Sequence, residues 1–239
     1  SDDILTIIAR SFSDAKRAIA APDPTYSLYP VLAQLQNAPF IRIPLNDGFA
    51  FPEDFAEKAK GANIVMLARP NAPTGTLFEK RAIEKLCKDF KGIVLIDEAY
   101  VDFAKDNCVD FVSRFSNAII SRTFSKSRSL AGLRFGYALA NAALIEGMMK
   151  VKDSYNVGYM TQKLALASLK EPEYFAETVA KVKATRETLV AGLAKLGFKV
   201  EPSETNFVFA APPSGDGKAY FQALREKKII VRYFSGPRT

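Results

Sequence analysis

Apolar residues occur along this chain in two alternating patterns. In one, three to six apolar residues follow one another directly, which is typical of a strand buried on both faces of a sheet. In the other, they recur every three or four positions, which is typical of a helix with one buried face. The first pattern predicts strands at residues 40–45, 64–68, 93–96, 118–120 and 135–140, and the second predicts helices at 4–12, 26–36, 52–60 and 78–90. We therefore expect an α/β fold with a mostly parallel sheet flanked by helices.

The pattern changes after about residue 165. Residues 171–196 have the spacing of one long amphipathic helix. Shorter segments then predict strands at 198–200, 206–210 and 229–231 and one helix at 218–227. We therefore expect two domains, a large α/β domain at residues 1–165 and a smaller α+β domain at residues 166–239.

The composition excludes several classes of function. The 239 residues contain no histidine, which rules out Ser-His-Asp and Cys-His catalysis and histidine-ligated zinc. Cys87 and Cys108 match neither a disulfide framework nor a metal site, so we expect no metal and a cytoplasmic location. The net charge of +7 is dispersed among acids without a basic run, so we expect no nucleic-acid partner. No apolar stretch reaches the roughly 20 residues that span a bilayer, so we expect no membrane segment.

Three chemically different side chains follow three of the predicted strands. Asn71, Asp97 and Lys126 each lie within a few residues of a strand's carboxyl end. Because ligands of open α/β sheets bind outside these ends, an amide, a carboxylate and an amine should meet in one crevice. Pyridoxal phosphate needs a lysine to bind its aldehyde and a carboxylate to keep its pyridine nitrogen protonated. A single lysine or aspartate is more often a solvated or turn-forming residue, so the combination is what predicts this cofactor.

The order and spacing of these residues resemble those of the fold-type-I aminotransferases. Asn71 stands in a PNAPTG motif, Asp97 and Tyr100 in DEAY, and Lys126 follows Ser125, eight positions before Arg134. Within that group the chain resembles the histidinol-phosphate aminotransferases. The segments that carry this narrower resemblance are PTYSLY at 24–29, TFSKSRSLAGLRFGY at 123–137 and IIVRYF at 229–234.

The resemblance implies a role for individual residues. Lys126, Asp97 and Tyr100 are the implied catalytic residues, and Tyr100 is expected to contact the phenolic oxygen of the cofactor. The implied cofactor-binding residues are Ser1, Asp2, Tyr26, Asn71, Asp97, Tyr100, Thr123, Ser125, Lys126 and Arg134. The implied substrate-binding residues are Tyr155, Asn156, Asn206 and Arg232, with Arg232 expected near a substrate phosphate.

The resemblance also implies the reaction and its partners. We expect transamination between histidinol phosphate and 2-oxoglutarate, a step of histidine biosynthesis, in a homodimer whose subunits share active sites. Three alternatives stay open. They are an aminotransferase for aromatic or other amino acids, a phosphothreonine-type decarboxylase with the same cofactor site, and a non-catalytic module that senses pyridoxal phosphate.

Relatives extend beyond this chain at both ends. They begin with an N-terminal arm that contacts substrate, and they continue into a strand bearing an arginine that grips it. This chain opens at Ser1-Asp2 and stops at Pro237-Arg238-Thr239. We therefore expect a form truncated at both ends, with an incomplete small domain and part of the substrate clamp missing.

Overall fold

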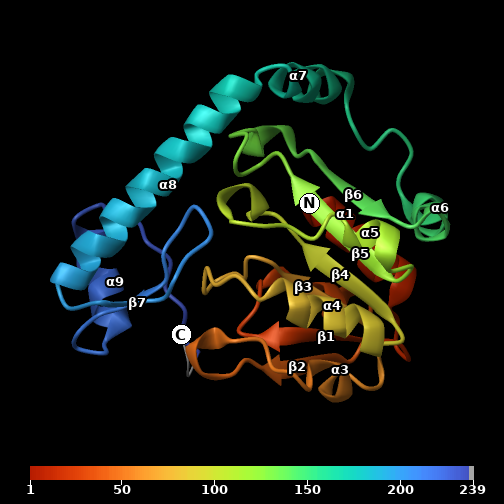
Figure 1. Ribbon diagram of the computed structural model, residues 1–239, viewed down its shortest axis with the longest axis horizontal. Coiled ribbons are helices and arrows are strands. Elements are labelled where there is room, and N and C mark those ends of the chain that lie inside the picture. The colour runs from red at the N-terminus through yellow and green to blue at the C-terminus, as the bar shows by residue number, and fades with distance from the viewer. Residues whose placement is uncertain (237–239) are drawn as a thin grey trace.

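A computed structural model describes residues 1–236 of the chain and shows a layered body with a long arm of helix (Figure 1). The helices are α1 (Asp2–Phe12), α2 (Leu28–Leu35), α3 (Phe55–Lys58), α4 (Lys80–Asp89), α5 (Phe111–Arg114), α6 (Ala142–Val151), α7 (Tyr159–Leu169), α8 (Pro172–Lys195) and α9 (Gly217–Glu226). Short 3-10 helices are η1 (Asp47–Phe49), η2 (Val101–Phe103) and η3 (Ala131–Leu133). The strands are β1 (Ala18–Asp23), β2 (Phe40–Pro44), β3 (Ala62–Ala68), β4 (Ile93–Asp97), β5 (Ala118–Thr123), β6 (Gly136–Ala140), β7 (Lys199–Val200) and β8 (Ala210–Ala211).

One six-stranded sheet forms the centre of the body. Its order is β2-β1-β3-β4-β5-β6, and every pairing is parallel except that of β5 with β6. The predicted mostly parallel sheet is therefore confirmed. The register sets Ala68 beside Asp97 and Asp97 beside Ser121, so the carboxyl ends of β3, β4 and β5 meet at one edge.

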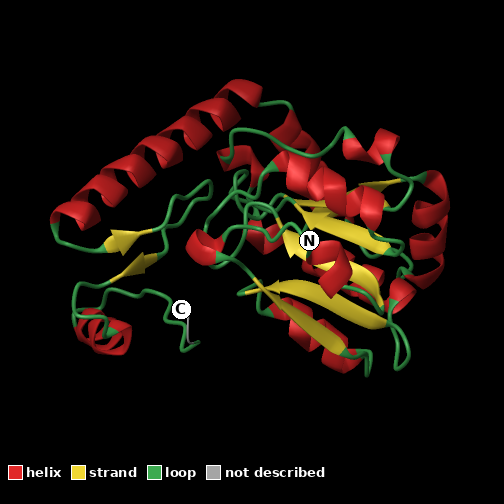
Figure 2. Cartoon of the chain, turned by 60° about the horizontal axis from the view of Figure 1, so that its bottom comes forward, coloured by secondary structure: helices red, strands yellow, loops and turns green. Residues whose placement is uncertain are grey.

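Helices cover both faces of this sheet (Figure 2). On one face, Val65, Ile96 and Ile120 pack with apolar residues of α3, α4 and α5. On the other face, Met66 and Leu95 pack against α1, α2 and α6. Successive strand residues point to opposite faces, which explains why the strands read as unbroken apolar runs. Each such side chain contributes about 1.5–3 kcal/mol when it leaves water completely.

The sequence pattern missed β1, α6 and α7. β1 is rich in alanine and contains Pro22, so it shows neither the β-branched residues nor the uninterrupted amide donors of a central strand. It is nevertheless held between two neighbours. Its pairing with β3 ends at Ala20, and Pro22 lies beside Ile43 of β2 only, so the proline falls outside the two-sided part of the strand.

Several predicted boundaries in the rest of the chain are wrong. The helix expected at 52–60 is only the single turn of α3, and the strand expected at 206–210 is β8, at Ala210–Ala211. The strand expected at 229–231 does not form among the described residues, because Ile229 and Ile230 stand 51% and 78% exposed with no strand to pair with. The long helix α8 and the helix α9 are confirmed to within two residues.

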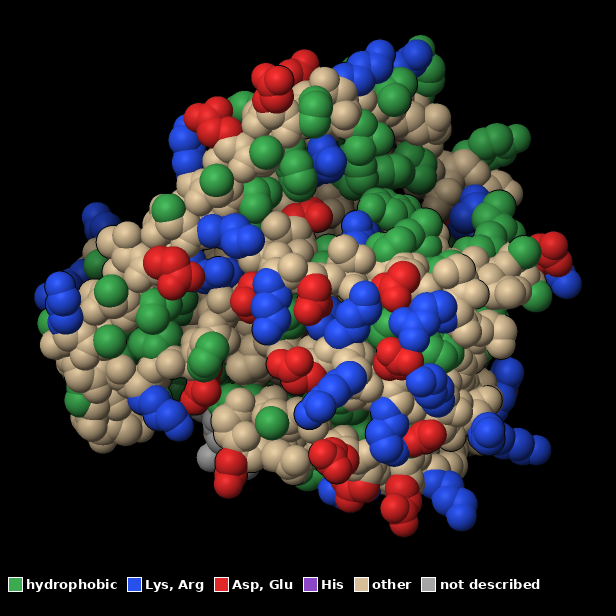
Figure 3. Space-filling view, viewed as in Figure 1, with side chains coloured by type: hydrophobic (Ala, Val, Ile, Leu, Met, Phe, Trp, Pro, Cys, Tyr) green, Lys and Arg blue, Asp and Glu red, His purple; other side chains and the backbone are tan. Residues whose placement is uncertain are grey.

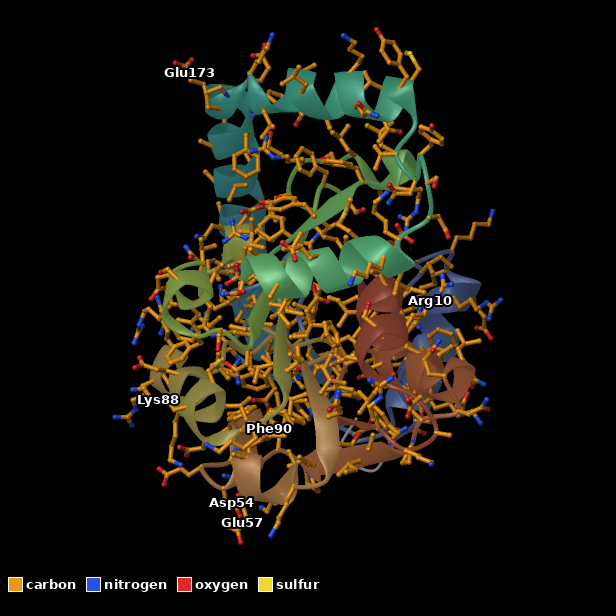
Figure 4. All side chains as sticks on the ribbon, turned by 90° about the vertical axis from the view of Figure 1, so that its right-hand side faces the viewer. Arg10, Asp54, Glu57, Lys88, Phe90 and Glu173 are labelled. Atoms are coloured by element: carbon orange, nitrogen blue, oxygen red, sulfur yellow. The ribbon has the colours of Figure 1, made fainter. Side chains whose placement is uncertain are left out.

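Residues 159–236, from α7 onward, are called the arm, and they lead away from the sheet. α8 connects α7 to the small hairpin of β7 and β8 and to α9 (Figure 1). Figure 4 shows Glu173, near the start of α8, at the opposite end of the molecule from Asp54 and Glu57 near α3. The predicted boundary after residue 165 falls inside α7, and the division into two domains stays a prediction. No helix within residues 1–236 is long and apolar enough to cross a membrane.

Candidate active site

A recess opens at the edge of the sheet where β3, β4 and β5 end. It encloses about 500 Å³ of empty space, part of it open to solvent. The lining residues are Ser1, Asp2, Tyr26, Ala68, Ala72, Asp97, Ala99, Tyr100, Thr123, Ser125, Lys126 and Arg134. All the cofactor-binding residues predicted from the sequence are in this set except Asn71. Segments that are far apart in the chain therefore meet in one place, as the parallel sheet requires.

Asp97 provides a deeply buried carboxylate on this lining. It is 3% exposed and accepts hydrogen bonds from Ser121 Oγ at 2.8 Å and from Tyr29 Oη at 3.3 Å. Burial raises the pKa of Asp97, and the hydrogen bond from Ser121 opposes that rise. One donor on each carboxylate oxygen holds the group in a single orientation.

Lys126 and Tyr100 face each other across the recess. The Lys126 Nζ lies 5.1 Å from the centre of the Tyr100 ring. The Tyr100 ring is in turn packed edge-on by Phe207, with 5.1 Å between ring centres. The loop that carries Lys126 is tied to η2 by a short hydrogen bond from Ser127 Oγ to Asp102. The amine and the phenol ring are therefore held by two loops that are bonded to each other.

The other end of the recess is suited to an anion. Arg134 adopts a left-handed backbone with φ +52°, and its Nη2 lies 3.0 Å from Asp2 Oδ2 at the start of α1. The hydroxyls of Thr123 and Ser125 are on the lining, and Thr123 Oγ1 accepts from the Ser125 amide at 3.1 Å. A guanidinium, two hydroxyls and the amino-terminal amides of an 11-residue helix together match the needs of a phosphate group.

Tyr26 stands between these two ends. Its hydroxyl donates to Asp2 Oδ1 at 3.4 Å, and its ring lies edge-on to Tyr29 with 5.7 Å between centres. Burial raises the pKa of Tyr26 to about 12, so its hydroxyl stays protonated at neutral pH. The ring therefore offers an apolar face to the recess, while its hydroxyl helps to place Asp2.

Asn71 lies just behind the lining. It is fully buried, and its Nδ2 donates to Thr74 Oγ1 at 2.9 Å and to the Pro24 carbonyl at 3.2 Å. Its Oδ1 is buried without a hydrogen-bond partner among the described residues. The next residue, Ala72, lines the recess. An amide with unused hydrogen-bonding capacity therefore stands next to the predicted ligand site.

The four predicted substrate-binding residues are exposed and lie outside the lining. Tyr155 is 98% exposed, and Asn156 Nδ2 donates to Asp3 Oδ2 at 3.2 Å. Arg232 lies over the Phe234 ring at 5.7 Å, and Asn206 stands directly before Phe207. Their roles stay predictions.

Sequence reasoning missed the residues that complete the site. Tyr29 was visible as the second tyrosine of PTYSLY, but nothing in the motif shows that it reaches Asp97. Ser121 faces Asp97 only because of the register between β4 and β5. Ala68, Ala72 and Ala99 leave space where larger side chains would fill the recess.

A second hollow lies at the opposite edge of the sheet. It encloses about 1220 Å³, much of it open solvent, between α3 and the end of α4, where Figure 4 labels Asp54, Glu57 and Phe90. Its rim mixes acidic and basic side chains, and no cluster of potential metal ligands occurs within residues 1–236. Burial raises the pKa of Cys87 and Cys108 to about 12, which makes both thiols poor nucleophiles. Among the described residues, the candidate chemistry that the sequence predicts lies at the first recess.

Known proteins resemble this chain over its whole length. The family model for class I and II aminotransferases matches residues 1–239, so the chain belongs to that family. Histidinol-phosphate aminotransferases from Microcystis aeruginosa and Synechocystis sp. are 46% and 44% identical to it over 238 residues. These alignments take in 100% of this chain and 68% of each relative.

Solved structures share the fold. The histidinol-phosphate aminotransferase of Clostridium acetobutylicum matches with a TM-score of 0.90 at 23% identity, covering 97% of this chain and 71% of that one. The enzyme from Sinorhizobium meliloti, in complex with pyridoxal-5'-phosphate, also matches with a TM-score of 0.90 at 23% identity, covering 99% and 67%. The fold-type-I architecture predicted from the sequence is thereby confirmed.

The groups around the recess fit pyridoxal phosphate. An amine, a buried carboxylate and a cluster suited to phosphate occur together, and two aromatic rings flank them. Lys126 would bind the aldehyde carbon, Asp97 the pyridine nitrogen, and Arg134 with Ser125 and Thr123 the phosphate.

Proposed function

We propose that this chain is a pyridoxal-phosphate-dependent aminotransferase that exchanges an amino group between histidinol phosphate and 2-oxoglutarate. The observation that carries the proposal is the meeting of Lys126, Asp97 and Arg134 around one recess. The family and the 40–46% identity to proteins named histidinol-phosphate aminotransferase support both the reaction class and the substrate. The cofactor when bound supplies an aldehyde and an electron-withdrawing ring that stabilises negative charge at the substrate α-carbon.

Asp97 is the group that would keep the pyridine nitrogen of the cofactor protonated. Its two carboxylate oxygens are already occupied by Ser121 and Tyr29, so its orientation is set before any ligand arrives. A buried carboxylate is costly to ionise, and a cationic ring nitrogen relieves that cost. Binding of the cofactor and ionisation of Asp97 should therefore favour each other.

Lys126 is the proton carrier. Its Nζ, when it is not bound to the cofactor, would take the proton from the α-carbon of the amino donor. The ring of Tyr100, backed by Phe207, limits the directions in which this amine can move and keeps water from one side of it. Arg134, which pairs with Asp2, and the start of α1 would bind the phosphate at the far end and so hold the reacting atoms in place.

The substrate side of the proposal rests on Arg232, Asn206, Tyr155 and Asn156. Arg232 would bind the phosphate of histidinol phosphate, as a planar guanidinium does in two-point contacts. Asn206, next to Phe207, would contact the substrate near Tyr100. Tyr155 and Asn156 lie in the loop that is bonded to Asp3, close to the start of α1.

A half-reaction screen tests the substrate. Purified protein loaded with pyridoxal phosphate is mixed with one amino compound at a time, and formation of pyridoxamine phosphate is followed by absorption. We expect histidinol phosphate and glutamate to react fastest. Faster reaction with aromatic amino acids would assign the chain to another specificity, and release of carbon dioxide from phosphothreonine would assign it to the decarboxylases. A protein that binds the cofactor and reacts with none of these would be the sensor module.

Replacement of Lys126 tests the site itself. Lys126→Ala should lose the visible absorption band of the covalently held cofactor, and turnover should fall by roughly 10²–10⁴-fold or more. Lys91→Ala, which removes an exposed lysine just before β4 at the opposite edge of the sheet, is the matched control and should behave as wild type. An unchanged band in Lys126→Ala would contradict the assignment.

We also propose a cytoplasmic homodimer with a large domain at 1–165 and a small domain at 166–239. Large apolar side chains lie exposed before and along α7 and at the start of α8. They are Tyr155, Tyr159, Met160, Leu164, Leu166, Leu169 and Tyr174. An exposed apolar patch of this kind marks an interface, and a second copy would cover it. Light scattering of the purified protein should give twice the mass of one chain, and a monomer at micromolar concentration would contradict it.

A further inference from the structure

Arg186 is the one buried residue of the long helix α8. Its side chain is 8% exposed although α8 is otherwise half-buried or exposed along its length. Its Nη1 donates to the Thr205 carbonyl at 2.9 Å and, more weakly, to the Phe103 carbonyl at 3.5 Å. Its Nε lies 3.2 Å from Glu187 Oε1, but that carboxylate is 70% exposed. One guanidinium therefore joins the main-chain carbonyls of Phe103 and Thr205, which are 102 residues apart in the sequence.

The Thr205 carbonyl belongs to loop 203–207, which rests on two loops of the recess. The Glu204 amide donates to the Gly75 carbonyl at 2.9 Å, in the PNAPTG turn. The Phe207 ring packs edge-on against Tyr100. Asn206, predicted to bind substrate, stands between Thr205, held by Arg186, and Phe207, held by Tyr100. The position of Asn206 is therefore set by contacts on both sides of it.

The Phe103 carbonyl belongs to η2, which is tied to the catalytic lysine. Phe103 follows Asp102, and Asp102 accepts the hydrogen bond from Ser127, the residue after Lys126. The Phe103 amide donates to the Tyr100 carbonyl at 3.0 Å. A chain of direct contacts thus runs from Arg186 to both residues that face each other across the recess. All the residues that make these contacts lie within residues 1–236.

We propose that Arg186 is a positioning residue that holds loop 203–207 and η2 together, and thereby places Asn206 and Tyr100 for substrate binding. A buried guanidinium that serves main-chain carbonyls would leave them unpaired if it were lost, so both segments would loosen together. The consequence for catalysis rests on the proposed aminotransferase function. The structural part does not, because it concerns the protein without substrate or cofactor.

Hydrogen exchange of cofactor-free protein tests the structural part. In Arg186→Gln, exchange at residues 203–207 and 100–104 should rise roughly tenfold or more, the factor expected when charge-assisted hydrogen bonds are lost. Exchange in β3 should not change. Arg186→Lys, which can reach one carbonyl but not offer the planar guanidinium, should fall between wild type and Arg186→Gln. Glu187→Gln removes only the exposed partner and should change exchange by less than about twofold.

Steady-state kinetics tests the catalytic part. In Arg186→Gln the KM for the amino donor should rise about tenfold as Asn206 loosens, and kcat should fall because Tyr100 no longer confines the Lys126 amine. The absorption of bound cofactor should be kept, because Lys126 and Asp97 are unchanged. Phe207→Leu removes the ring that packs against Tyr100 and leaves the Arg186 guanidinium in place. It should give the same rise in KM and faster hydrogen exchange at residues 203–207. If Arg186→Gln does not fold, Arg186→Lys decides the matter, because it changes the same two contacts and keeps the charge.

Two results would overturn the proposal. One is exchange at 203–207 that stays as in wild type when Arg186 or Phe207 is replaced. The other is an increase in hydrogen exchange that is as large in β3 as at residues 203–207, which would show that Arg186 contributes only to overall stability. If the protein proves inactive with every amino donor, the exchange result still stands and only the proposed function fails.

Discussion

The sheet layer and the arm of this protein are stabilised in different ways. In the layer, up to the end of α6, strands and helices bury two continuous apolar clusters. Beyond α6, the buried residues among those described are only Ala165, Arg186 and Thr205. The layer therefore depends on continuous apolar burial, whereas the arm is attached by separate contacts, some of them hydrogen bonds to main-chain carbonyls and some of them aromatic contacts of Phe207 and Phe209.

This difference matches a division of labour in the proposed reaction. The groups suited to the cofactor stand on the layer, at the ends of β4 and β5 and in the segments beside them, and the strands that carry them are buried in the core. The predicted substrate residues stand on the arm or the loop before it. In Figure 3, apolar side chains gather around α7 and α8, whereas acidic and basic side chains are interspersed over the lower part of the layer. The arm thus presents surface for further contacts, and the layer presents solvated charge.

The largest effect should come from the carboxylate at the edge of the layer. Asp97→Asn removes the charge opposite the pyridine nitrogen and should lower transamination by roughly 10²–10⁴-fold. In contrast, the substitution should make the cofactor-free protein more stable than wild type at neutral pH. Burial raises the pKa of Asp97 above its value in the unfolded chain. Asp97 therefore contributes to the free energy of unfolding only at low pH, where it is protonated, and that contribution is lost as the pH rises through the raised pKa.

The pH dependence provides the control for Asp97. The melting temperature of cofactor-free Asp97→Asn should exceed that of wild type at pH 7, and the difference should shrink as pH falls below the unfolded pKa. Other acids, including Glu98, whose pKa burial also raises, are present in both proteins and cancel in the difference. A variant less stable than wild type at pH 7, or one with near-normal turnover, would contradict the assignment.

A matched pair of truncations should separate the layer from the arm. Ile120 of β5 is fully buried, so Ile120→Ala should cost about 2–5 kcal/mol of unfolding free energy. Leu189 of α8 is 48% exposed, and Leu189→Ala should cost less than about 1 kcal/mol. Urea unfolding of both variants measures the difference. Equal costs would mean that a partner surface buries α8 as fully as the core buries β5.

Two glycines test the contact between the regions. Gly75 has φ +78°, and a Cβ there would lie 2.9 Å from Ser203 Oγ of the arm. Gly48 has φ +62° with nothing within 4 Å of such a Cβ. Gly48→Ala should therefore cost about 1–2 kcal/mol for the left-handed backbone alone, and Gly75→Ala should cost more. If Ser203→Gly does not recover the extra cost in the Gly75→Ala background, the arm does not approach as closely as described.

The smallest effect should come from a side chain of the arm. Arg232→Ala should raise the KM for histidinol phosphate about tenfold, the loss of one charged contact, and leave the KM for glutamate within about twofold. Cofactor absorption should not change, because Arg232 lies outside the recess. Steady-state kinetics with both amino donors provides the measurement. Equal changes for the two substrates would exclude a role in binding the substrate phosphate.

Much of the layer and its site could be predicted from the sequence. The runs that became β3, β4 and β5 are apolar enough to be recognised. Asp97 ends β4, and Asn71 and Lys126 lie three residues after the ends of β3 and β5. The sequence did not predict β1, because a segment of alanines with one proline is as typical of a loop as of a strand. Its neighbours in the sheet are what bury it. In the arm, the sequence predicted α8 and α9 but not α7 or the extent of the strands, because weakly buried short elements carry weak patterns, as the exposed residues at 229–231 show.

By itself, the sequence determined which residues are buried in the sheet and which chemical groups stand at the strand ends, since side-chain polarity and local spacing are properties of neighbouring residues. Only the tertiary structure decided that Tyr29 and Ser121 hold Asp97, and that Arg186 reaches both Phe103 and Thr205. Those contacts depend on strand register and on how helices pack across the chain. Hydrogen bonds between distant segments leave no periodic trace in the order of amino acids.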